Sequence, residues 1–168
     1  MKRHFAAALL LGAGTFATAV GLPTPTASAS TTMPFKAALT GSFTPTSTGF
    51  NVGGAGHASA LGKTSNVGVV VMQPQPNPAC PSTGFVVTND EVLTAANGDQ
   101  LDISILDMPC PVAGEPGIYD GKSTYLITGG TGRFVGATGQ GSFDGRGDFT
   151  NPEDLTFVYT FAGSLNHR

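Results

Sequence analysis

From residue 34 onward the chain consists of short apolar or alternating runs separated by Gly, Pro and Asn. No window carries a sustained 3.6-residue apolar repeat with capping residues, as an amphipathic helix requires. The runs are rich in Val, Phe and Thr, which favour strands, and poor in Lys, Glu and Leu, which favour helices. Eight strands are therefore predicted, at residues 34–43, 55–64, 66–73, 84–96, 99–106, 118–128, 142–149 and 154–165.

The clearest alternation lies in residues 99–106, where Leu101, Ile103 and Ile105 fall on one side and polar residues on the other. Successive side chains of a strand point to opposite faces, so this strand has one buried and one wet face. The last run alternates in the same way, through Leu155, Phe157, Tyr159 and Phe161.

Turn residues divide these strands. Asn97-Gly98 between two strand-like runs predicts a two-residue hairpin of type I′, which needs positive φ at both positions. Residues 44–54 are predicted as a turn-rich connection, and residues 74–83 and 107–117 as surface loops because prolines lack the donor that a central strand needs.

Eight short antiparallel strands over this length favour an all-β, closed antiparallel barrel, whose interior is either packed or holds one small ligand. The alternative is a two-sheet β-sandwich. Either fold forms a single domain, at residues 30–168.

The first 29 residues have the features of a secretory signal peptide. A basic start is followed by an uncharged apolar run and by Ala27-Ser28-Ala29, which fits the A-x-A cleavage pattern. The run is short for a membrane span, and no later segment is apolar enough to be one. The sequence therefore predicts a secreted, extracellular protein that starts near Ser30. The six basic and eleven acidic residues left give a net charge of −5, which does not favour nucleic acid or anionic membranes as partners.

Two cysteines, Cys80 and Cys110, each lie in one of the Pro-rich loops. In an oxidising compartment an even count favours a disulfide, and the hairpin between these cysteines should bring the two loops together, with Cα atoms within about 7 Å. Free thiols or metal ligands are the alternative. Metal binding has little support, because neither His57 nor His167 lies at ligand spacing from a cysteine.

A glycine-rich segment follows the strand at residues 118–128. It superficially matches a dinucleotide-binding turn, but its third glycine comes one residue late and no helix-forming sequence follows it. The glycines are better explained as tight turns at a barrel corner, with Phe134 and Val135 tucked into the barrel end and Arg133 bracing the turn. The structural glycines are Gly129, Gly130, Gly132, Gly136 and Gly139.

The stretch GGTGRFVGATGQGSF at residues 129–143, between a strand and a final aromatic strand, resembles the GGTGxFxGAxGxG pattern of the allene oxide cyclase and dirigent-like barrel superfamily, in particular its uncharacterised secreted bacterial members. Residues 57–62 and 93–99 also resemble earlier strands of those proteins. The resemblance implies an eight-stranded barrel with a central cavity, a small apolar ligand or substrate, and a homo-oligomer. It transfers no catalytic residue, because positions outside the glycine motif do not match.

Catalytic motifs give little further guidance. The chain has no Ser nucleophile elbow and no zinc-binding spacing, and Asp144, Asp148, Glu153 and Asp154 do not follow the spacing of a calcium loop. His57 is a candidate general base or a partly buried structural histidine. Asp99 and Asp102 face either the lumen or solvent.

Three functions remain at this point: binding of a small, mainly apolar molecule in the lumen, cofactor-free cyclisation or isomerisation there, and a structural role with a packed lumen. No cofactor, metal or catalytic residue is assigned.

Overall fold

The computed structural model describes residues 31–80 and 84–167, so the predicted signal peptide at residues 1–29 lies outside the described residues. Almost every described segment between turns is a strand. The elements are β1 (Thr31–Pro45), β2 (Gly49–Ala58), β3 (Gly62–Pro76), β4 (Phe85–Ala95), β5 (Gln100–Asp107), β6 (Cys110–Pro111), β7 (Ile118–Gly130), the 3₁₀ turn η1 (Gly132–Phe134), β8 (Thr138–Asp148) and β9 (Thr156–His167).

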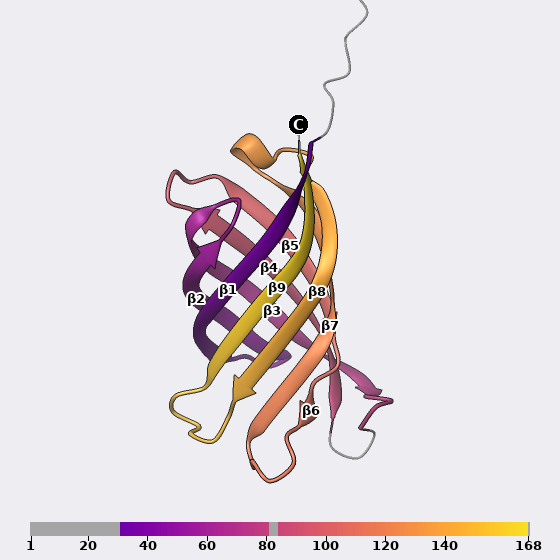
Figure 1. The fold of residues 1–168 in the computed structure, drawn as a ribbon. Coiled ribbons are helices and arrows are strands. Elements are labelled where there is room, and N and C mark those ends of the chain that lie inside the picture. The colour runs from indigo at the N-terminus through magenta and orange to yellow at the C-terminus, as the bar shows by residue number, and fades with distance from the viewer. Residues whose placement is uncertain (1–30, 81–83, 168) are drawn as a thin grey trace, which may run out of the picture.

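Eight of these strands form a closed antiparallel barrel (Figure 1). The pairing runs from β5 through β4, β3, β2, β1, β9 and β8 to β7, and β7 pairs back with β5 to close the ring. The short β6 pairs with β7 outside the ring. Closure leaves no unpaired edge within the ring, and it confirms the predicted barrel over the sandwich. In the described part of the chain, no helix is long and apolar enough to span a membrane.

The prediction for the second and third strands was wrong in its boundaries. The break falls at residues 59–61 rather than near Ser65-Asn66, and residues 49–54, predicted as a connection, begin β2. Glycines hide the alternation in this segment, because they carry no side chain to mark a face. The structure shows why they are there: a Cβ on Gly56 would lie 1.9 Å from the carbonyl oxygen of Ala38 on β1.

The other boundary differences lie at turns. β3 continues to Pro76, through a register shift after Met72, where residues 74–83 were predicted to be loop. The Asn97-Gly98 hairpin exists, but it is not type I′: in the described residues only glycines have positive φ, here Gly98 at 88°. Hydrogen bonds from Gly98 N to Ala95 O and from Ala95 N to Asp99 O make it a longer loop with glycine in the left-handed position.

Large side chains fill the middle of the barrel. The alternation in β5 holds, since Leu101, Ile103 and Ile105 are all buried. Tyr125 is completely buried and lies against two inward-facing glycines: a Cβ on Gly141 or on Gly163 would come within 2.7 Å of its side chain. The glycines of β8 and β9 thus make room for aromatic rings in the lumen.

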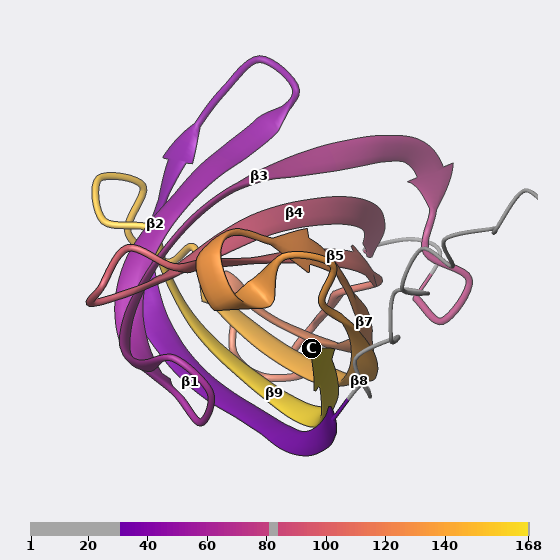
Figure 2. The ribbon, with the colours of Figure 1, turned by 90° about the horizontal axis from the view of Figure 1, so that it is seen from above.

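One end of the barrel, here called the capped end, is closed by η1 (Figure 2). Phe134 is only 1% exposed and packs in the hydrophobic core, as predicted, but Val135 is 66% exposed and does not tuck into the barrel. A three-residue 3₁₀ turn points consecutive side chains in different directions, so only one of the pair can face inward. Of the five predicted turn glycines, Gly132 and Gly136 enter and leave the cap with φ of 57° and 71°. The prediction is wrong for the other three, because Gly129 and Gly130 end β7 and Gly139 lies in β8.

Arg133 braces this cap, as predicted. Its Nε lies 3.2 Å from Asp99 Oδ2, and its guanidinium carbon lies 4.9 Å from the centre of the Phe134 ring. Two hydrogen bonds between Gln100 and Thr131 tie the start of β5 to the residue before η1.

A disulfide lies near the opposite end, here called the open end, where β1, β3, β5 and β8 finish. The sulfur atoms of Cys80 and Cys110 are 2.09 Å apart and the Cα atoms 6.0 Å apart, in agreement with the predicted bridge. Buried Asn77 supports it by donating from Nδ2 to the carbonyl oxygen of Met108 at 2.8 Å. The connection after β5 is thereby held against the connection after β3.

Candidate functional site

The open end is surrounded by aromatic side chains. Phe149 is the centre of this group: its ring lies 5.2 Å from that of Phe43, 5.5 Å from Phe50 and 5.8 Å from Tyr119, centroid to centroid. Tyr119 in turn lies 5.3 Å from Phe85. These five residues form what we call the aromatic mouth. All but Phe43 are only half-buried, so the mouth presents ring surface to solvent.

Behind the aromatic mouth lies a pocket with a volume of about 50 Å³, partly open to solvent. Every strand of the ring contributes at least one residue to the pocket wall. Much of the wall is apolar, for example at Val70, Val87 and Phe143. A site for one water needs about 10–15 Å³, so the pocket has room for roughly four waters or for one small polar group with its adjoining carbon atoms.

Four polar side chains line the same pocket: Asn89 on β4, Asp107 on β5, Tyr119 on β7 and Tyr159 on β9. Asn89 and Asp107 are 2% and 8% exposed. Five buried side-chain atoms in the described residues lack a hydrogen-bond partner: Asn66 Oδ1, Asn89 Oδ1, Asp107 Oδ1, Ser123 Oγ and the Tyr125 hydroxyl. Only Asn89 and Asp107 among these residues line the pocket, and we call their two Oδ1 atoms the open acceptors. A buried polar atom without a partner costs about 1–3 kcal/mol, which makes such atoms unusual in a packed core.

The Asp107 carboxyl group packs against the backbone of β7. A Cβ on Gly121 would lie 2.1 Å from Asp107 Oδ2, so only glycine at this position leaves space for the carboxyl group. Burial raises the pKa of Asp107 above its ordinary value of 3.8, although the backbone N–H of Met108 and the Ser123 hydroxyl beside the carboxyl group oppose the shift.

Glu91 lies next to Asn89 on the inner face of β4 and is fully buried. Its two carboxylate oxygens each accept one amide: Asn89 Nδ2 donates to Oε1 at 2.8 Å, and Asn66 Nδ2 donates to Oε2 at 3.1 Å. Burial raises the pKa of Glu91 from 4.5 to about 7, although the two amide hydrogen bonds oppose the shift.

The pKa of Tyr159 is affected by burial and by the carboxyl groups of Glu91 and Asp107. Burial raises the pKa of its hydroxyl well above 10, and the charges of Glu91 and Asp107 raise it further. The pocket wall thus carries a phenol and the Asp107 carboxyl group, and Glu91 is linked to the wall through its hydrogen bond with Asn89. The pKa values of both carboxyl groups are raised toward neutrality, whereas the pKa of the phenol is raised further from it. Carboxyl groups of this kind can donate or accept protons near neutral pH.

The side chains named as candidates from sequence lie elsewhere. His57 is exposed on β2, so it is neither a base inside the lumen nor a partly buried structural histidine. Asp102 alternates with buried neighbours on β5 and therefore faces outward, and Asp99 is at the capped end. Among the described residues, no three His, Cys, Asp or Glu side chains are grouped as a metal site would need.

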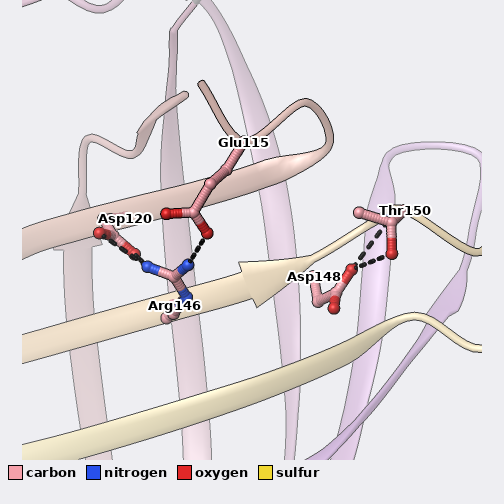
Figure 3. Close-up of polar contacts among 5 residues, drawn as sticks. All are labelled: Glu115, Asp120, Arg146, Asp148 and Thr150. Carbon is pink, nitrogen blue, oxygen red and sulfur yellow. Dashed lines mark hydrogen bonds and ion pairs between the residues drawn. The ribbon is translucent and has the colours of Figure 1, made fainter. Parts of the chain in front are cut away.

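The acidic residues near the end of β8 lie on the outer wall (Figure 3). Arg146 pairs with Glu115 and, through Nη1 at 3.1 Å, with Asp120 Oδ1. Asp148 Oδ1 accepts hydrogen bonds from the backbone N–H and the hydroxyl of Thr150, at 2.9 and 2.6 Å. These bonds lower the pKa of Asp148 and stabilise the turn after β8.

Sequence reasoning missed Asn66, Asn89, Glu91 and Asp107. The sequence holds a signal for Asn89 and Glu91, because they fall on the same face of β4 as the buried residues Val87, Leu93 and Ala95. Adjacent polar residues at Asn89, Asp90 and Glu91 conceal this alternation. Asp107 simply continues the inward series of Leu101, Ile103 and Ile105.

In the comparisons with known proteins, no family model, curated protein or solved structure matches the chain. The barrel agrees with the fold that the resemblance to the allene oxide cyclase and dirigent-like superfamily implies, and membership of that superfamily stays a prediction.

Proposed function

We propose that the protein binds a small, mainly apolar molecule in the pocket at the open end of its barrel. The observation that carries this proposal is the combination of an aromatic mouth with buried polar atoms that lack partners on the same pocket wall. Apolar pockets with a few convergent polar groups are the usual form of small-molecule sites.

The contrast with the rest of the lumen supports the proposal. The middle and the capped end are filled by side chains such as Tyr125, Phe134 and Leu165, all at most 1% exposed. A purely structural barrel would gain stability from the same packing at its open end. Half-buried rings around an incompletely filled pocket are instead suited to covering a ligand.

The test is a titration with toluene, followed by NMR of methyl-labelled protein. The methyl groups of Val70 and Val87, which line the pocket, should shift, whereas those of Leu165 in the packed core should not. Val70→Phe fills the pocket and should abolish the shifts. Val69→Phe is the matched control, because Val69 is 47% exposed and does not line the pocket. Binding that survives Val70→Phe unchanged would disprove the proposed site.

The polar wall favours a second candidate, a cofactor-free cyclase or isomerase. Asp107 on the pocket wall and Glu91, linked to the wall through Asn89, provide carboxyl groups that can act as acid and base beside an apolar pocket, as proton transfer in a folded substrate requires. In that case Asp107→Asn would lower kcat by about 10²–10⁴-fold and leave substrate binding nearly intact. An unchanged kcat in Asp107→Asn would exclude Asp107 from the chemistry.

A further inference from the structure

The open acceptors specify the kind of polar group that the pocket accepts. Both are oxygen atoms on neighbouring strands, in a register that places Asn89 opposite Ile105, two residues from Asp107. Inward side chains in such diagonal positions are about 7–8 Å apart or less, so both open acceptors face the same small pocket, but a single O–H proton bonds only one of them. An acceptor oxygen is satisfied only by a donor, so a ligand with only an ether or carbonyl oxygen leaves both unpaired.

Glu91 determines that the oxygen of the Asn89 amide, and not its nitrogen, faces the pocket. An asparagine amide offers one donor and one acceptor side, and either can face a pocket. Here Nδ2 is held by Glu91 Oε1, so the oxygen is the polar atom that remains to meet a ligand. Asn66 donates to the other carboxylate oxygen of Glu91, so it does not compete with Asn89 for Oε1.

We infer that the ligand is an apolar molecule that carries an O–H or N–H donor, and that this donor enters the pocket to bond one of the open acceptors, Asn89 Oδ1 or Asp107 Oδ1, while the apolar part packs against the aromatic mouth. This inference rests on the proposed function. The volume agrees with it, because about 50 Å³ accommodates a polar group and its adjoining carbons but not a whole ring system.

The experiment compares three probes of similar shape at pH 8: benzyl alcohol, benzyl methyl ether and toluene. Dissociation constants are measured by NMR titration of the whole protein. Benzyl alcohol should bind about tenfold more tightly than the ether, the amount that one buried hydrogen bond typically contributes. Equal affinities for all three would disprove the donor requirement and leave the pocket itself intact. No binding of any probe would disprove the proposed function as well.

Asn89 and Asn66 provide a matched pair of variants. Both are buried asparagines that donate Nδ2 to Glu91, but only Asn89 lines the pocket. Asn89→Leu should remove most of the preference for the alcohol, whereas Asn66→Leu should keep it despite a similar loss of stability. Loss of the preference in both variants, or in neither, would show that Asn89 Oδ1 is not the recognising atom.

Asp107→Asn keeps the shape of the side chain and is the second variant should Asn89→Leu fail to fold. The new amide can donate to an ether oxygen, so the preference for benzyl alcohol over benzyl methyl ether should fall several-fold, in part because the ether binds more tightly. An unchanged ratio would exclude Asp107 from recognition.

Discussion

The two ends of the barrel are finished in different ways. At the capped end a short segment folds inward, Phe134 completes the core, and the polar groups beside it are paired through Arg133 and Asp99. At the open end all rings of the mouth except Phe43 stay half-buried, and two of the five buried polar atoms without partners among the described residues lie on one pocket wall. Complete packing contributes stability, whereas incomplete packing leaves room and hydrogen-bonding capacity for another molecule.

The largest effect is expected from Phe134→Ala at the capped end. Removal of a fully buried ring should lower the free energy of unfolding by about 3–5 kcal/mol, through lost burial and the cavity left behind. Urea unfolding measures the change. Val135→Ala is the control, because that neighbour is exposed and should cost less than about 0.5 kcal/mol. A small effect of Phe134→Ala would mean that η1 is an appendage rather than a cap.

The disulfide is the main stabilising link at the open end. Cys80→Ser/Cys110→Ser should cost about 3.5 kcal/mol in urea unfolding, because a 30-residue loop is no longer constrained in the unfolded chain. Toluene binding should weaken too, since Pro109, next to Cys110, lines the pocket. Unchanged stability together with unchanged binding would show that the connection after β5 holds its place without the bridge.

The buried Glu91 should make stability depend on pH. Its pKa is higher in the folded state, about 7 against 4.5, so folding takes up a proton between these values. Stability from this group is therefore fully present below about pH 4.5 and is lost as pH rises through 7, by about 3 kcal/mol in all. Burial of Asp107 acts in the same direction. Glu91→Gln should flatten the difference between unfolding at pH 5 and at pH 8, and parallel curves for the two proteins would contradict the shift.

The smallest effects are expected from the surface ion pairs at the two ends. Arg146→Met breaks two exposed pairs on the outer wall and should cost at most about 0.5 kcal/mol, less at high salt. Arg133→Met should cost up to about 1 kcal/mol, because Arg133 also stacks on Phe134. Thermal unfolding at low and high salt separates the two. A larger cost at Arg146 would reverse the ranking of the two ends.

The sequence was a good guide wherever side chains alternate visibly. β5 was placed within one residue at each end, and its buried face was correct. It was a poor guide for β2, where glycines carry no signal of face, and for the 97–98 turn, where one positive φ rather than two was needed. The site residues were missed for a related reason: three consecutive polar residues on β4 do not show which of them points inward.

The sequence by itself determined the all-β class, the number of strands in the ring, the disulfide and the inward position of Phe134. These follow from local chemistry: alternation, turn residues, a single cysteine pair and a glycine motif. Only the tertiary structure decided that Asn89 and Asp107 face one pocket, that Glu91 holds the Asn89 amide, and that Tyr159 joins them from the last strand. Which side chains meet across the lumen depends on the register of eight strands around a closed ring, and no single segment contains that information.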